Sequence, residues 1–169
     1  MQLCTAAERN FAAQDPNTCL LKLRQFGEAL AQHVAALLGV DASQQTSQAD
    51  LLMTLQRRHQ LDRSVADMLH LLRQRGNAAN HHFAATPITT TEALSALRVA
   101  RELALWLHRA FGKSSAAFKP GPFVAPVMTD YASVAHRLQA EVAVKTAQAE
   151  AAWASVTDEG SPGAFRPSV

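Results

Sequence analysis

The hydrophobic positions of this 169-residue chain recur at helical spacing in five stretches before residue 112. Apolar residues that return every three or four positions lie on one face of a helix. This spacing predicts helices over residues 3–14, 18–38, 49–59, 63–83 and 91–111. We expect the core to form where the apolar faces of these helices meet. Its predicted members are Leu23, Leu30, Leu69, Leu72, Leu103 and Trp106.

Residues that favour helix ends mark the boundaries between these stretches. A residue before proline avoids the α-helical conformation, so the first helix should stop at Asp15-Pro16. Gly39 is expected just beyond the end of the second helix, where the backbone turns left-handed. The expected N-caps are Asn17 or Thr18 for the second helix, Asp62 for the fourth, and Thr90 or Thr91 for the fifth.

Beyond residue 111 the pattern changes, which divides the chain into a helical bundle (1–111) and a further part. Residues 112–129 contain three prolines and two glycines, which predicts a linker that acts as a flexible junction. The sequence pattern of residues 130–157 predicts a C-terminal helical arm. We expect this arm to dock on a partner or to lead to further chain. Residues 158–169 are expected to be disordered. The apolar stripe of the arm is Tyr131, Ala135, Leu138, Val142, Thr146, Ala149 and Trp153.

Composition favours an all-α fold class, because 33 alanines and 20 leucines stand against 11 valines and one isoleucine. The net charge of +2 lacks the excess of a protein that coats nucleic acid. No apolar run approaches the roughly 20 residues of a membrane span. The first ten residues have neither the basic nor the apolar region of an export signal. We therefore expect a cytoplasmic protein with no membrane partner.

Cysteine and histidine spacings do not predict a metal site. The chain has no H-E-x-x-H motif, and neither cysteine lies near a histidine pair at zinc-ligand spacing. Cys4 and Cys19 alone cannot complete a site with four ligands, and we expect them to be small buried or half-buried side chains. The sequence thus predicts no metal and no cofactor.

The strongest candidate for chemistry is the end of the fourth helix. Arg73, Asn77 and His81 are spaced by four residues, so they form one polar row beside the apolar stripe. Arg75 and His82, seven residues apart, lie on the opposite edge of that stripe. These positions bring cationic, amide and imidazole groups to one helix end.

Two interpretations of this segment remain open. A histidine can take a proton from a ribose 2′-hydroxyl while arginine stabilises charge on the phosphate. On that hypothesis Arg75 and His81 are the catalytic residues of a metal-independent endoribonuclease. On the structural interpretation, Asn77 and His81 hydrogen-bond the helix end to a neighbour, and the arginines solvate the surface. We favour the structural interpretation, because a short motif needs structural context before it indicates function.

Four blocks of sequence resemble the N-terminal helical region of type I restriction enzyme R-subunit-like proteins. The blocks are DPNTCLLKLRQFGEALAQHVAA, LLRQRGNAANH, LRVARELALWLHRAFG and FKPGPFVAP, in the order of that family, over roughly residues 8–126. The region is similar to HEPN folds, which are helical bundles of defence ribonucleases and accessory modules. The resemblance implies an HEPN-like bundle of about five helices. The family's R…GN…H signature then falls on Arg73, Gly76, Asn77 and His81, with His82 beside it.

The resemblance implies a non-catalytic N-terminal interaction domain that acts in DNA restriction and anti-phage defence. Its expected partners are other restriction-complex subunits or a downstream translocase domain, with nucleic acid and a second copy of the chain as further candidates. The alternatives are an HEPN-type endoribonuclease using Arg75 and His81, and a structural dimerisation domain. No complete Walker motif or nuclease carboxylate cluster occurs in the sequence. We therefore expect a fragment or a stand-alone relative that has no restriction activity of its own.

Overall fold

The computed structural model describes residues 2–42, 47–58, 61–80, 87–112 and 118–159, with side chains as far as residue 154. All regular secondary structure in these ranges is helical, which confirms the predicted all-α fold class. The chain divides into two compact units, Met1–Thr129 and Asp130–Val169. The helices are α1 (Gln2–Ala12), α2 (Pro16–Leu37), α3 (Gln48–Arg57), α4 (Arg63–Asn80), α5 (Thr90–Phe111) and α6 (Tyr131–Glu159).

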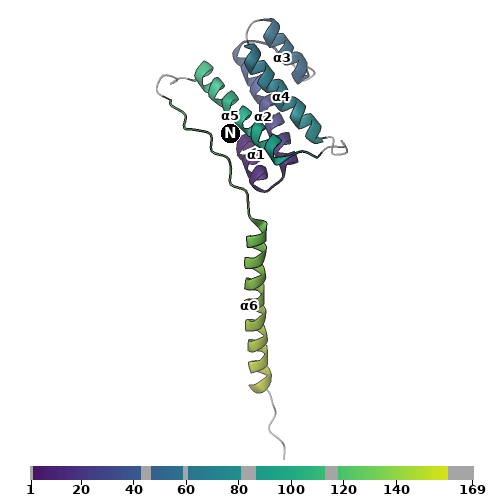
Figure 1. Ribbon diagram of the computed structural model, residues 1–169, viewed down its shortest axis with the longest axis vertical. Coiled ribbons are helices and arrows are strands. Elements are labelled where there is room, and N and C mark those ends of the chain that lie inside the picture. Colours follow the sequence, from purple (N-terminus) through teal and green to yellow (C-terminus); the bar gives the residue numbers. More distant parts are fainter. Residues whose placement is uncertain (1, 43–46, 59–60, 81–86, 113–117, 160–169) are drawn as a thin grey trace, which may run out of the picture. The chain divides into compact units, whose positions relative to one another are not determined.

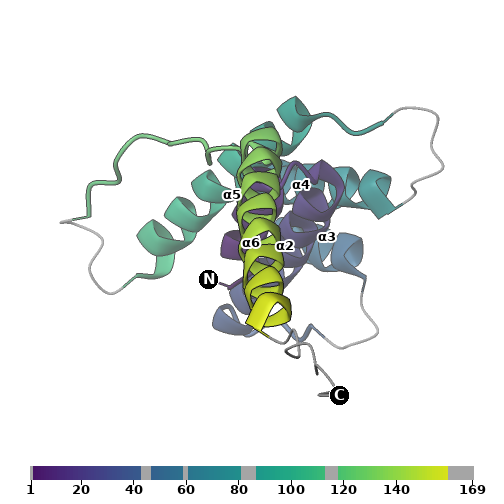
Figure 2. The same cartoon turned by 90° about the horizontal axis from the view of Figure 1, so that it is seen from below.

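The first unit is a bundle built around α2. This helix contacts α1, α3, α4 and α5, and α4 and α5 also contact each other. Figure 1 shows α3 at the edge of the bundle away from α1. In the second view α3 and α5 lie on opposite sides of α2 (Figure 2). The central helix therefore supplies the surface on which the other four are positioned.

Leucine and alanine side chains from all five helices fill the core of this unit. Five of the six predicted core residues are buried, namely Leu23, Leu30, Leu69, Leu72 and Leu103. The sixth, Trp106, is only half-buried and packs against the edge of this core. It lies near the end of α5, where the indole meets the Phe111 ring edge-on with centroids 6.0 Å apart. The end of α5 has fewer helices to pack against than its middle.

The predicted N-caps of α2 and α5 are wrong by a few residues. Asp15 caps α2, and its carboxylate accepts a hydrogen bond from the backbone N–H of Thr18 at 2.9 Å. Pro16 is then the first helical residue, a position where proline costs nothing because that N–H has no helical partner. Thr89 caps α5 and forms a capping box with Glu92, so neither Thr90 nor Thr91 has this role.

Gly39 ends α2 as predicted. Its φ is +67°, in the left-handed region that favours glycine. The N–H of Gly39 donates to the carbonyl of Ala36, and the N–H of Val40 donates to that of Ala35. This hydrogen-bond pattern is a Schellman motif, and it satisfies carbonyls that the helix end would leave unpaired.

The remaining helix ends differ slightly from prediction or cannot be compared with it. α3 ends at Arg57 and α4 at Asn80. The ends predicted at His59 and near His82 lie outside the described residues. α6 reaches Glu159, beyond the predicted end at residue 157.

Candidate functional site

The segment that carries the R…GN signature forms the last turns of α4, where this helix crosses α2. Gly76 is buried at the crossing. A Cβ added there would lie 2.3 Å from Cβ of Arg24 and 3.0 Å from the carbonyl oxygen of Leu20. The glycine therefore allows a close approach of the two helices. The role of Gly76 in this structure is to let α2 and α4 pack closely.

Arg75 lies on the side of α4 that faces α5. Its guanidinium forms an ion pair with the carboxylate of Glu92. Glu92 also accepts hydrogen bonds from the backbone and hydroxyl of Thr89 in the capping box. These hydrogen bonds from Thr89, together with the positive charge of Arg75, lower the pKa of the Glu92 carboxyl from its ordinary value. Arg75 thus joins the end of α4 to the start of α5.

Arg73 and Asn77 are half-buried on the other edge of the α4 stripe. The Nε of Arg73 is buried and has no hydrogen-bond partner among the described residues, and the same is true of Nε of Arg24 on α2. The two predicted rows, one with Arg73 and one with Arg75, therefore lie on different edges of the helix, as expected. His81 and His82 lie outside the described residues, so their distances from the arginines stay untested.

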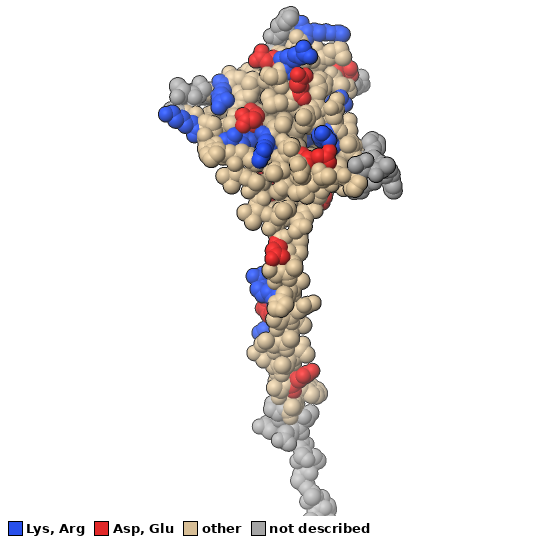
Figure 3. All heavy atoms as spheres, in the orientation of Figure 1, with Lys and Arg blue, Asp and Glu red and all other residues tan. Residues whose placement is uncertain are grey.

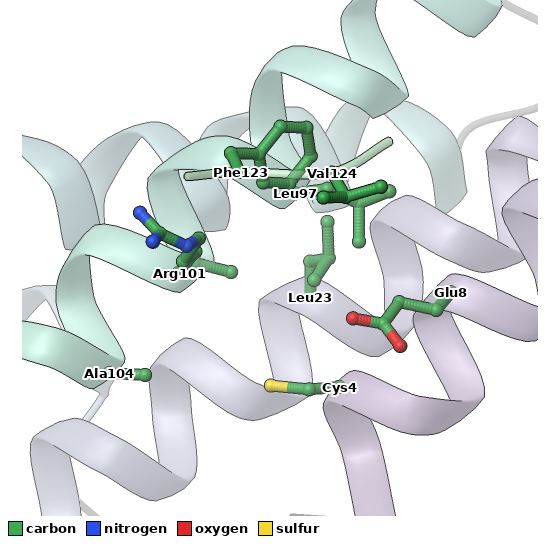
Figure 4. Close-up of a pocket in the computed structure, with 9 residues that line it drawn as sticks. Cys4, Glu8, Leu23, Leu97, Arg101, Ala104, Phe123 and Val124 are labelled. Atoms are coloured by element: carbon green, nitrogen blue, oxygen red, sulfur yellow. The ribbon is translucent and has the colours of Figure 1, made fainter. Parts of the chain in front are cut away.

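A pocket of about 360 Å³ lies between α1, α2, α5 and the segment that follows α5. Figure 4 shows the Cys4 thiol and the Glu8 carboxylate reaching it from α1, and Arg101 entering from α5. Phe123 and Val124 close another side. An apolar lining with one carboxylate and one guanidinium suits an apolar side chain that carries a polar end. Sequence reasoning missed this pocket, because its walls come from four separate parts of the chain.

The two cysteines behave as the sequence predicts. Cys19 is buried and Cys4 is half-buried. Burial raises the pKa of the Cys19 thiol to about 12, and it also raises the pKa of Cys4. Since the thiolate is the reactive form, both groups are poor nucleophiles at neutral pH. The cysteine in the pocket therefore contributes shape and apolar surface.

The proline-rich segment is anchored to the bundle from residue 118 onward. Its Gly121 carbonyl accepts a hydrogen bond from the guanidinium of Arg101. The Phe123 ring lies 5.4 Å beneath the Arg98 guanidinium carbon, and the Thr129 N–H donates to the Ala12 carbonyl at 2.7 Å. Residues 118–129 thus contact the bundle without forming a helix, and the flexibility expected of the linker stays a prediction. Residues 113–117 lie outside the described part of the chain.

This anchored segment also carries exposed apolar side chains, which we call the apolar strip. Val127 is 86% exposed and Val124 is 79% exposed. Val124 also borders the pocket, so strip and pocket form one surface. Large apolar side chains exposed to water can contribute to a surface that binds another protein. The members of the apolar strip are Phe118, Val124, Val127 and Met128.

Charges of both signs are interspersed over the face of the bundle seen in Figure 3, without a broad basic patch. Within the described ranges, no three or more His, Cys, Asp or Glu side chains are grouped to hold a metal ion. In those same ranges, no helix has the length and hydropathy to cross a membrane. The described surface is thus distinguished by apolar groups rather than by charge.

The first unit is therefore an all-α helical bundle with an apolar strip beside a small pocket. The family model of the domain of unknown function DUF4145 matches residues 5–107, and the chain belongs to this family. The chain is also 36% identical over 107 residues to the endonuclease subunit of the type I restriction enzyme EcoKI from Escherichia coli (strain K12). The matched region is 63% of this chain and 9% of that relative. No solved structure matches the chain.

Proposed function

We propose that the first unit is a non-catalytic N-terminal interaction domain of a type I restriction R-subunit-like protein, acting in DNA restriction and anti-phage defence. The observation that carries the proposal is the 36% identity to the EcoKI endonuclease subunit over 107 residues. The proposal includes the HEPN-like character of the bundle, which the order of the four sequence blocks supports. A restriction role places the protein in the cytoplasm, where the DNA to be cleaved enters.

The apolar strip and the adjoining pocket are the surface that we propose for the partner. Val124 and Val127 expose most of their area, although hydrogen bonds hold the segment that carries them. A surface that is already ordered loses little conformational entropy on binding. The proposed partner is another subunit of the restriction complex or a downstream translocase domain, which would cover the strip and place a side chain in the pocket.

The use of the signature residues within the fold supports the non-catalytic part of the proposal. Arg75 is engaged by Glu92, and Gly76 is in contact with Arg24 and the backbone at Leu20. A catalytic arginine must instead be available to a phosphate in the transition state. The ion pair to α5 favours a role for Arg75 in joining two helices.

The experiment is a binding titration of the purified chain with the purified remaining subunits of the type I complex from the same organism. Val127→Glu places a charge in the apolar strip and should weaken binding at least about tenfold, or about 1.4 kcal/mol. Gln32→Glu adds the same charge to an exposed position of α2 and should leave the affinity unchanged. Absence of binding by the wild-type chain would contradict the restriction role, and equal binding by Val127→Glu would contradict the proposed surface.

A further inference from the structure

Four buried polar atoms without a hydrogen-bond partner lie around the crossing of α2 and α4. They are Nε of Arg24 on α2, Nε of Arg73 on α4, and both amide atoms of Gln48 at the start of α3. Elsewhere in the described ranges, the only other such atom is Nε2 of His108. Buried polar groups are nearly always hydrogen-bonded, because an unpaired group has lost its hydration without compensation. Unpaired groups that gather at one crossing therefore indicate a binding site.

The contacts of two glycines show that these three side chains share the crossing. A Cβ added to Gly76 would lie 3.0 Å from Cδ of Arg24, and one added to Gly27 would lie 3.7 Å from Nε2 of Gln48. Arg24 precedes Gly27 by three residues, and Arg73 precedes Gly76 by three. Residues three apart in a helix are neighbours on its surface. The two arginines and the glutamine therefore surround one short stretch of the crossing.

The three side chains also come to the same side of the bundle. Arg73 lies on the edge of α4 opposite to Arg75, and Arg75 pairs with Glu92 on α5. The edge with Arg73 thus faces away from α5. Helix α3, which carries Gln48, lies on the opposite side of α2 from α5 (Figure 2). This arginine–glutamine site is therefore separate from the apolar strip and the pocket, which adjoin α1 and α5.

The positive charge of this site is not neutralised by the protein. Within the described ranges, neither Arg24 nor Arg73 forms an ion pair with a carboxylate. The acidic residue nearest to Arg24 along α2 is Glu28, one turn away, and no ion pair joins it to either arginine in those ranges. Two guanidinium groups at one crossing repel each other, and an anion between them replaces this repulsion with attraction. The site therefore favours an anion.

The number of donors indicates the kind of anion. We propose that Arg24, Gln48 and Arg73 bind a phosphate dianion, either free or as the terminal phosphate of a nucleoside monophosphate. Two guanidinium charges match the two charges of this anion. Each guanidinium offers a planar fork of N–H donors, and the glutamine amide offers two further N–H donors. A carboxylate has only two oxygens in one plane, whereas the oxygens of a phosphate point toward donors from several directions.

Isothermal titration calorimetry of the full chain with inorganic phosphate tests this site. Arg24→Gln and Arg73→Gln should each lower the affinity at least about tenfold, because each removes one charge and one fork. The matched control is Arg63→Gln, which makes the same change at a side chain of α4 that is 91% exposed, and it should leave the affinity within about twofold. A wild type that binds no phosphate at millimolar concentration, or equal effects of all three substitutions, would overturn the proposal.

Arg24→Lys separates binding from folding. Lysine keeps the charge and most of the stem that packs at Gly76, but it lacks the planar fork. This variant should bind phosphate more weakly than the wild type and remain as helical by circular dichroism. Wild-type affinity in Arg24→Lys would contradict the proposed role of the fork.

Titrations with other ligands identify the source of the phosphate. Tighter binding of adenosine 5′-monophosphate than of inorganic phosphate, lost in Arg73→Gln, would support a nucleotide as the ligand. Equal or weaker binding of the nucleotide would support free phosphate. Acetate that binds as tightly as phosphate, or adenosine that binds as tightly as its monophosphate, would overturn the proposal, because neither ligand carries the dianion.

Discussion

Replacing Leu72 with alanine is expected to lower the free energy of unfolding by about 2–5 kcal/mol. Leu72 is 1% exposed and belongs to the face of α4 that packs on α2. It lies over Gly27, where an added Cβ would be 3.5 Å from Leu72 Cδ1. The backbones already approach closely here, so the bundle cannot collapse to fill the cavity. The substitution therefore loses both the burial of the side chain and its packing contacts.

The neighbouring residue provides a matched control. Leu71 is 37% exposed on the same helix, so Leu71→Ala should change the free energy of unfolding by no more than about 0.5 kcal/mol. Chemical denaturation followed by circular dichroism measures both variants. Equal effects of the two substitutions, or a change below about half a kilocalorie for Leu72→Ala, would show that the phase of α4 is wrong.

The second large effect is expected at the crossing of α2 and α4. Gly76→Ala should destabilise the first unit by about 1–3 kcal/mol, because a Cβ 2.3 Å from that of Arg24 forces the helices apart. This cost outweighs the gain of about 1 kcal/mol that alanine has over glycine in a helix. The close atoms include the carbonyl oxygen of Leu20, which a side-chain rotation cannot move.

Gly27→Ala is the matched control, because it adds the same methyl group to a helical glycine without a close contact. It therefore shows the effect of helix propensity on stability alone. Its added Cβ would have no neighbour closer than 3.5 Å, which is ordinary van der Waals distance. This variant should be neutral or more stable by about 0.5–1 kcal/mol. Thermal unfolding of both variants tests the difference. A Gly76→Ala protein as stable as Gly27→Ala would mean that the two helices do not approach as closely as described.

Helical periodicity made the number of helices and most of the core predictable. Leucines at spacings of three and four identified the buried faces of α2 and α4, because the buried residues of each helix recur at this spacing. Trp106 was predicted to belong to the core because periodicity indicates the face of the helix on which a residue lies. Periodicity does not indicate how far the neighbouring helices extend along α5, so it could not predict that Trp106 is only half-buried. The caps were missed by a few residues because several Asp, Asn and Thr side chains adjoin each helix start, and local sequence does not rank them.

The candidate site was predictable only where one helix contains it. The two edges of α4 and the close approach at Gly76 follow from helical geometry within a single segment. The ion pair of Arg75 with Glu92 joins residues 17 positions apart on different helices, so it depends on how these helices pack. The anchoring of residues 118–129 was missed because the absence of helical periodicity does not distinguish a free segment from one fixed by Arg101 and Phe123.

The proposal that the first unit is an interaction domain rather than an enzyme is supported by the use of Arg75 and Gly76 in contacts between helices. The competing hypothesis makes Arg75 and His81 a ribonuclease pair. Incubation of the purified wild-type chain with single-stranded RNA, without divalent metal, separates the two most directly. We expect no cleavage by the wild type. Metal-independent cleavage that is lost in both His81→Ala and Arg75→Ala, with each variant still folded by circular dichroism, would contradict the account and identify this helix end as a catalytic centre.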